Sequence, residues 1–308
     1  MSGKEVVIDV QNLTKRYGEV AAVDDVNFQV KPGEIVGFVG LNGAGKSTTI
    51  NLLLGFINAN SGKVKLFDEV VAPANAADSH QDIGFATGDM ALFDKMTGRQ
   101  YHDFIAKSFR RPIDKTVYDS LCDRFQPELT KPIRQLSRGN RQKVALIAAF
   151  MTDPKLVILD EPSSGLDPVM QQAFRDLLRE HQNLGTTVFM SSHYLSEVRE
   201  VCSRILVIRD GKIIKDIEAD ELASTGGKLI RLVTESQCSL PEGSKLVQAE
   251  QLDKGFVTEF VTSLNMAELQ KWLGSIAGLR DISIADSTIE TAFHDLYNAP
   301  GVDDVSNF

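Results

Sequence analysis

The most constraining feature of this sequence is a glycine-rich loop between an apolar run and a segment with helical character. Residues 35–39 read Ile-Val-Gly-Phe-Val, which is typical of a strand buried on both faces. Residues 40–48 then read Gly-Leu-Asn-Gly-Ala-Gly-Lys-Ser-Thr and satisfy the phosphate-binding pattern G-x-x-x-x-G-K-[ST]. Backbone N–H groups in such a loop curl around an anion, and the next helix adds the positive end of its dipole. The sequence therefore predicts a phosphate-binding loop in an α/β fold.

Two side chains of this loop have specific expected contacts. Lys46 would reach the β- and γ-phosphates of a nucleotide, and the hydroxyl of Ser47 would bind Mg²⁺. A plain glycine-rich turn is the alternative, but the position between a strand and a helix favours phosphate binding. The residues predicted to bind the nucleotide here are Gly40, Leu41, Asn42, Gly43, Ala44, Gly45, Lys46, Ser47 and Thr48.

A second apolar run ends in two acids. Residues 156–159 read Leu-Val-Ile-Leu, and Asp160 and Glu161 follow. Ligands of a parallel sheet bind beyond the carboxyl ends of its strands, so we expect this pair to face the phosphate-binding loop. Asp160 would hold Mg²⁺ through a water, and Glu161 would polarise an attacking water. The alternative is that two acids merely end a strand at the solvent.

Further motifs follow in a recognisable order, and over roughly residues 5–220 the chain resembles the ATP-binding subunits of ABC transporters. Residues 136–142, Leu-Ser-Arg-Gly-Asn-Arg-Gln, resemble the signature loop of that family, and residues 164–167 resemble its D-loop. His193, after two serines, matches the switch histidine. Tyr17 stands where the family stacks an aromatic ring on adenine.

The resemblance implies a P-loop ATPase fold with an antiparallel β part and a helical insert, binding ATP and Mg²⁺. In the family, Ser137 and Gly139 would bind the γ-phosphate held by a second ATP-binding subunit, either a copy or a sister chain. His193 would contact the γ-phosphate of its own site, and catalysis would depend on Glu161, His193 and Lys46. More ordinary roles stay open at this point: Ser137 as a helix N-cap, His193 as a strand-end histidine, and Tyr17 as an edge aromatic.

Three departures from the family pattern are visible. Leu41 replaces a common proline, and Arg138 and Asn140 replace a glycine and a glutamine of the signature. The Q-loop region, residues 83–89, contains no glutamine, and either Gly88 or Asp89 takes its place. We hypothesise that Asp89 substitutes as an oxygen ligand in the Mg²⁺ shell, since Mg²⁺ prefers carboxylate oxygens.

The alternation of strands and helices predicts an α/β domain over residues 1–224, with a mostly helical insert at about 97–152. Residues 205–214 predict a hairpin with a type I′ turn. Small residues at 223–227 mark a linker, and residues 225–308 predict an accessory α+β domain. Its last segment, residues 287–297, resembles the closing helix of drug- and polysaccharide-type exporters, which favours export.

Composition narrows the function classes. The net charge of −9 argues against a nucleic-acid partner, which favours a basic surface. No apolar run approaches the ~20 residues of a membrane span, so transport would need a separate transmembrane permease subunit. We then expect the chain at the cytoplasmic face of the cell membrane. Competing hypotheses are a soluble ABC-type ATPase in iron–sulfur or ribosome assembly, and a nucleotide sensor without turnover.

Overall fold

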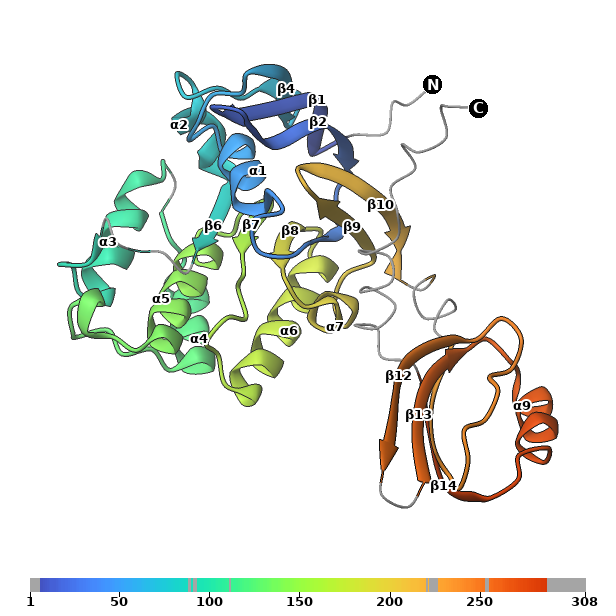
Figure 1. Cartoon of the computed structure of the whole chain (residues 1–308). Helices are drawn as coiled ribbons and strands as arrows, with labels where there is room; N and C mark the ends of the chain where they lie inside the picture. The colour runs from blue at the N-terminus through green and yellow to red at the C-terminus, as the bar shows by residue number, and fades with distance from the viewer. Residues whose placement is uncertain are drawn as a thin grey trace. The chain divides into compact units, whose positions relative to one another are not determined.

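The structure, a computed structural model, describes residues 6–87, 90, 93–110, 112–219, 221, 227–252 and 255–286. The chain divides into two compact units, Met1–Ala219 and Asp220–Phe308 (Figure 1), and each is described by itself. The predicted linker lies almost wholly at 222–226, outside the described residues, as does the predicted closing helix at 287–297. None of the described helices combines the length and the hydropathy that a membrane crossing needs.

Two sheets form the first unit. A four-stranded sheet has the order β2-β1-β4-β5, and a six-stranded sheet has the order β10-β9-β3-β8-β7-β6. In the larger sheet β3, β6, β7, β8 and β9 run parallel, and β10 pairs with β9 as an antiparallel hairpin. The strands are β1 Ile8–Tyr17, β2 Val20–Val30, β3 Ile35–Val39, β4 Ser61–Leu66, β5 Glu69–Val70, β6 Ile83–Thr87, β7 Leu156–Asp160, β8 Thr187–Ser192, β9 Arg204–Arg209 and β10 Lys212–Glu218.

Helices surround this larger sheet, and α3, α4 and α5 group together in the predicted insert (Figure 1). The side chains of Thr97, Asp114 and Ser137 accept a backbone N–H in the first turn of these three helices, as N-caps do. The helices are α1 Lys46–Leu53, α2 Ala76–Ser79, α3 Gly98–Ser108, α4 Lys115–Phe125, α5 Arg138–Phe150, α6 Pro168–Asn183 and α7 Leu195–Arg199, with 3-10 turns η1 His80–Asp82 and η3 Ile133–Gln135.

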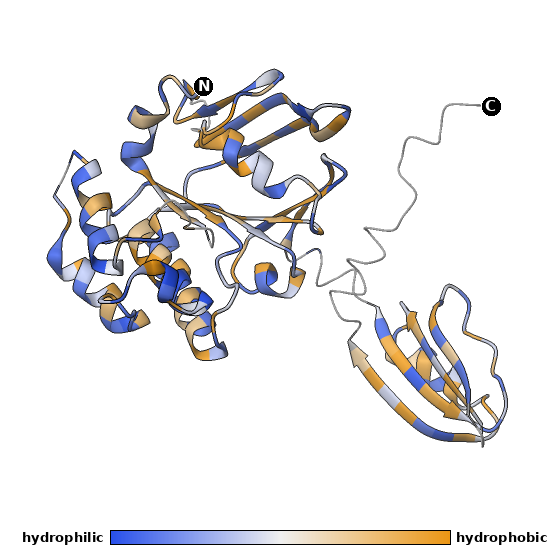
Figure 2. Cartoon of the chain, turned by 60° about the vertical axis from the view of Figure 1, so that its left-hand side comes forward, coloured by the Kyte–Doolittle hydropathy of each residue, from blue (hydrophilic) through white to orange (hydrophobic). Residues whose placement is uncertain are grey.

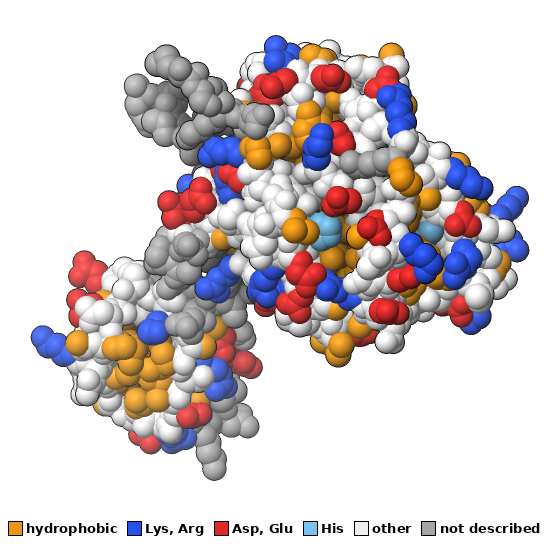
Figure 3. Space-filling view, turned by 180° about the vertical axis from the view of Figure 1, so that it is seen from behind, with side chains coloured by type: hydrophobic (Ala, Val, Ile, Leu, Met, Phe, Trp, Pro, Cys, Tyr) orange, Lys and Arg blue, Asp and Glu red, His pale blue; other side chains and the backbone are white. Residues whose placement is uncertain are grey.

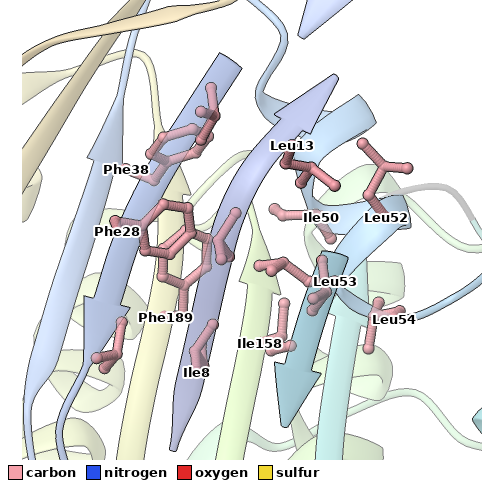
Figure 4. Packing of buried hydrophobic residues seen from close by; sticks show 14 of the residues in the cluster. Ile8, Leu13, Phe28, Phe38, Ile50, Leu52, Leu53, Leu54, Ile158 and Phe189 are labelled. Atoms are coloured by element: carbon pink, nitrogen blue, oxygen red, sulfur yellow. The ribbon is translucent and has the colours of Figure 1, made fainter. Parts of the chain in front are cut away.

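An aromatic cluster joins the two sheets. The rings of Phe28 on β2 and Phe189 on β8 stack with centroids 5.5 Å apart, and Phe38 on β3 lies 5.3 Å from Phe189 (Figure 4). All three side chains are buried. Burying each ring stabilises the fold by about 1.5–3 kcal/mol. The cluster therefore anchors β3 and β8, whose carboxyl ends lead into the glycine-rich loop and into His193.

The second unit is a four-stranded antiparallel sheet of order β12-β13-β11-β14 with one described helix, α9. Hydrophobic and hydrophilic residues alternate along its strands (Figure 2), and Ile230, Leu232, Phe260 and Leu269 form its core. Figure 3 shows hydrophobic side chains gathered on one face of this unit. Its elements are β11 Lys228–Thr234, β12 Lys245–Leu252, β13 Gly255–Thr262, α9 Met266–Leu273 and β14 Leu279–Asp286.

Candidate nucleotide-binding site

The glycine-rich loop connects β3 to α1, in the strand–loop–helix order that was predicted. Gly45 has φ +108°, and a Cβ there would lie 2.2 Å from the carbonyl oxygen of Ala22, so only glycine fits. The loop residues differ in exposure: Leu41, Asn42, Gly43 and Ser47 are exposed, Thr48 is half-buried, and Gly40, Ala44, Gly45 and Lys46 are buried.

Lys46 turns back over this loop. Its Nζ donates to the carbonyl oxygens of Gly40 at 2.8 Å and Leu41 at 3.2 Å. Nζ also lies 3.7 Å from Oε1 of Glu161. Burial lowers the pKa of Lys46, while the carboxylates of Glu161 and Asp160 oppose that shift. The ammonium group is therefore held at the mouth of the loop, where phosphate oxygens would replace its present partners.

Asp160 and Glu161 stand at the carboxyl end of β7, beside β8. The hydroxyl of Ser191 on β8 donates to Oδ1 of Asp160 at 2.6 Å and accepts the N–H of Glu161 at 3.0 Å. Glu161 has φ +50°, a left-handed conformation, and follows the last residue of β7. One buried serine thus orients both acids.

His193 follows β8 directly. Its Nδ1 lies 3.3 Å from Oε1 of Glu161, and its ring packs against that of Tyr194 with centroids 3.9 Å apart. Nδ1 is buried and makes no hydrogen bond within the described part of the chain, so the contact with Glu161 has the distance of an ion pair without hydrogen-bond geometry. The structure therefore brings Lys46, Glu161 and His193 together around one carboxylate oxygen.

Two of the predicted metal ligands share one groove. Ser47 and Asp160 both line it, and their hydroxyl and carboxylate oxygens are the ligand type that Mg²⁺ prefers. Because Ser47 is exposed and the hydrogen bond from Ser191 goes to one of the two Asp160 oxygens, Oδ1, this donor set fits Mg²⁺. The third predicted ligand, Asp89, lies outside the described residues, as does Gly88.

The same groove continues over apolar side chains. It has a volume of about 840 Å³. Phe56 is 51% exposed, and its ring meets those of His80 and Phe85 edge-on, at 5.6 and 5.7 Å. The aromatic side chains that line the groove are those of Phe56, Phe85, Phe93, Tyr101 and Phe109.

The signature residues lie elsewhere, at the start of α5, and Arg138 and Gly139 contact the loop at 164–167. Ser137 caps α5, accepting the N–H of Asn140 at 3.3 Å, and the guanidinium of Arg138 donates to the hydroxyl of Ser164. A Cβ on Gly139 would lie 2.5 Å from the carbonyl oxygen of Gly165. Replacing this glycine would therefore push the two loops apart.

Tyr17 ends β1 with its side chain 54% exposed. The Nζ of Lys15 lies 5.2 Å from the ring centroid, a cation–π distance. The ring is therefore available for stacking, and its predicted partner adenine stays a prediction.

Sequence reasoning missed three residues behind the site: Ser191, Ser192 and Glu197. A serine pair just before His193 was visible, but a short polar side chain in a buried strand gives no sign of its partners. The partners of Ser191, Asp160 and Glu161, lie 31 and 30 residues away along the chain, and Glu197 joins Ser192 to Ser163, which lies 34 residues before Glu197.

Comparison with known proteins supports the family suggested by the motifs. Residues 23–164 match the family described as ABC transporter. The chain is 34% identical over 75% of its length to the bacitracin transport ATP-binding protein BcrA of Bacillus licheniformis, covering 76% of that protein. It is 31% identical over 74% of its length to the SkfA peptide export ATP-binding protein SkfE of Bacillus subtilis, covering 98% of that protein.

Two further comparisons concern a longer relative and a solved structure. The chain spans one third (33%) of ABC transporter G family member 23 of Dictyostelium discoideum, at 31% identity over 78% of its own length. A solved structure described as the ATP-binding subunit of an ABC transporter superposes with a TM-score of 0.64 at 25% identity, covering 70% of this chain and 91% of that one. The motifs, the fold and these relatives agree, and the chain belongs to the family of ABC transporter ATP-binding proteins.

Proposed function

We propose that this chain is the ATP-hydrolysing subunit of an exporter and powers transport through a separate transmembrane subunit. The observation that supports this best is the position of Glu161, whose Oε1 lies 3.7 Å from Lys46 and 3.3 Å from His193. A carboxylate beside two cationic or hydrogen-bonding groups at the end of the phosphate-binding loop suits attack by water on a terminal phosphate.

Each residue then has a role in that reaction. Lys46 neutralises charge on the β- and γ-phosphates, and Glu161 orients the attacking water and accepts its proton. His193 donates to the γ-phosphate, where negative charge develops in the transition state. Tyr17 offers its exposed ring to adenine, a contact worth about 1–3 kcal/mol by analogy with base stacking on aromatics.

Mg²⁺ would be held by Ser47 and Asp160, with Asp89 as a further proposed oxygen ligand. When bound, the ion supplies positive charge that offsets the charge of the phosphates. Ser191 keeps Asp160 in place through its 2.6 Å hydrogen bond.

A second ATP-binding subunit, a copy or a sister chain, completes each site in this proposal. Ser137 stands at the N-terminus of α5, where a hydroxyl, backbone N–H groups and the helix dipole suit an anion. Its own hydrogen bonds and those of Arg138 lie within α5 and with Ser164, which leaves this anion-binding end for the partner's γ-phosphate.

The groove at Phe56 and Phe85 would receive the transmembrane subunit, because exposed aromatic side chains beside the nucleotide site suit a protein partner. Binding there would hold the chain at the cytoplasmic face of the membrane. Export is favoured by relatives named for bacitracin transport and SkfA peptide export.

The test is ATP turnover by the purified chain, compared with its Lys46→Ala variant. Phosphate release that needs both ATP and Mg²⁺, and that the variant loses together with ATP binding, would support the proposal. A purified chain that binds no ATP would refute it.

A further inference from the structure

Glu197 lies on the short helix α7, close to the segments that carry Glu161 and His193, here called the catalytic pair. Its Oε2 accepts the hydroxyl of Ser163 at 2.7 Å and the hydroxyl of Ser192 at 2.9 Å. Both serines are buried and Glu197 is half-buried. A carboxylate that is partly removed from water needs hydrogen-bond donors from the protein, and the two serines supply them.

The two serines belong to the two segments that carry the catalytic pair. Ser163 follows Glu161 by two residues, and Ser192 immediately precedes His193. A single carboxylate oxygen therefore connects the loop after β7 to the end of β8. These segments carry Glu161 and His193, whose Oε1 and Nδ1 lie 3.3 Å apart.

Ser192 has only one hydroxyl hydrogen, and two acceptors lie within reach. Oε2 of Glu197 is at 2.9 Å and the carbonyl oxygen of Tyr194 is at 3.1 Å. The ionised carboxylate is the stronger acceptor, so the hydrogen goes to Glu197. The oxygen of that hydroxyl in turn accepts the N–H of Tyr194 at 2.9 Å, which orients the chain on the far side of His193.

Ser192 also reaches the phosphate-binding loop, because its carbonyl oxygen accepts the N–H of Gly40 at 3.3 Å. The connection made by Glu197 thus includes the start of the loop that holds Lys46. Three segments distant in sequence, after β3, β7 and β8, meet at this point.

We infer that Glu197 is a positioning residue for ATP hydrolysis: it sets the distance between Glu161 and His193 through Ser163 and Ser192. This inference rests on the proposed function and assigns no contact between Glu197 and the nucleotide. Turnover should respond strongly to the loss of this carboxylate, because a displacement of about 1 Å between reacting groups can cost ~10²-fold in rate.

The experiment compares ATP turnover and ATP affinity in Glu197→Ala, Glu197→Gln, Ser163→Ala and the double variant Glu197→Ala/Ser163→Ala. Glu200→Gln is the matched control, since Glu200 is an exposed carboxylate nearby whose side chain pairs with Arg175 at 2.9 Å. The expected result is a split between rate and affinity. We expect Glu197→Ala to lower kcat by ~10–100-fold, while the Kd for ATP changes less than about threefold. Glu197→Gln keeps an oxygen acceptor and should recover most of kcat. The double variant should be no slower than Glu197→Ala alone, because the two residues act as a unit.

Three results would overturn the inference: unchanged kcat in Glu197→Ala, a fall in ATP affinity that matches the fall in kcat, or additive effects in the double variant. Ser163→Ala removes one of the two hydroxyls that donate to Glu197 and leaves the carboxylate in place. It should also lower kcat, and an unchanged kcat in Ser163→Ala would overturn the inference should Glu197→Ala fold poorly. A wild-type chain without any ATP turnover would refute the proposed function and this inference together. Normal turnover in wild type and in Glu197→Ala would refute the inference alone.

Discussion

Oε1 of Glu161 lies 3.3 Å from Nδ1 of His193. The same oxygen is 3.7 Å from Nζ of Lys46, so one acceptor faces two groups that would also face a γ-phosphate. A phosphate with several negative charges competes with Glu161 for both. Binding of ATP would therefore release the carboxylate toward the attacking water.

Glu161→Gln should bind ATP as tightly as wild type and hydrolyse it ~10²–10⁴-fold more slowly, because the amide accepts no proton from water. Equilibrium binding of ATP and single-turnover phosphate release measure the two quantities separately. Glu200→Gln, which removes a carboxylate that pairs with Arg175, should keep wild-type turnover. Unimpaired phosphate release in Glu161→Gln would remove Glu161 from its role.

Much of the nucleotide site was predictable because its signals are local in sequence. The strand before Gly40, the strand before Asp160 and the helix N-cap Ser137 each depend on a few neighbouring residues. The predicted type I′ hairpin is confirmed by positive φ angles at Asp210 and Gly211, +49° and +78°.

The rest depends on pairings that no short window contains. Strands β11 and β12 were not predicted. Ile230 and Leu232 on β11 are buried through pairing with strands distant in sequence, β13 and β14. Leu246 and Val247 on β12 are exposed, and β12 pairs with β13. The support of Asp160 by Ser191 joins residues 31 positions apart, and serine has no pattern that marks such a partner. Side-chain identity predicted the groups proposed to do the chemistry, and the tertiary structure was needed to find the groups that hold them.

Loss of the Asp160 carboxylate should raise the Mg²⁺ concentration needed for half-maximal turnover. We expect Asp160→Asn to raise it by at least ~10-fold and Ser191→Ala to raise it by a similar factor through the lost 2.6 Å hydrogen bond. Asp89→Ala should also raise it. A Mg²⁺ titration identical to wild type in Asp89→Ala would refute the proposed substitution for the Q-loop glutamine.

The stability of the first unit should fall on acidification through His102. Its Nε2 lies 2.9 Å from the carbonyl oxygen of Val144 and so donates, which leaves Nδ1 to accept the hydroxyl of Tyr118 at 3.1 Å. Burial lowers the pKa of His102, and the bond to Val144 opposes only part of that shift. Below about pH 6.5 the unfolded chain therefore binds a proton that the folded chain does not, and the free energy of unfolding drops by up to about 1.4 kcal/mol per pH unit.

Urea unfolding at pH 7.5 and 5.5 measures this loss in wild type and in His102→Gln. Burial also lowers the pKa of His80 and His181, so the variant should show a smaller loss rather than none. The same loss in both proteins would contradict the assignment to His102.

Phe56→Glu should weaken binding of the transmembrane subunit, because it places a charge on an apolar groove. Co-purification from detergent extracts of cells making both subunits is the measurement. Leu184→Glu is the matched control, since Leu184 is 77% exposed and does not line the groove. Equal recovery of the membrane subunit with both variants would place its docking site elsewhere.

The most direct test is the molecular mass of Glu161→Gln in solution, measured by light scattering with and without saturating ATP and Mg²⁺. If loops from two chains bind the same γ-phosphate, the measured mass doubles on addition of ATP. Adding Ser137→Ala to this variant should lower the fraction of dimer. Should the chain pair only with a sister ATPase, the doubling appears once that protein is present. A monomeric mass under saturating ATP, both alone and with such a partner, would contradict the account.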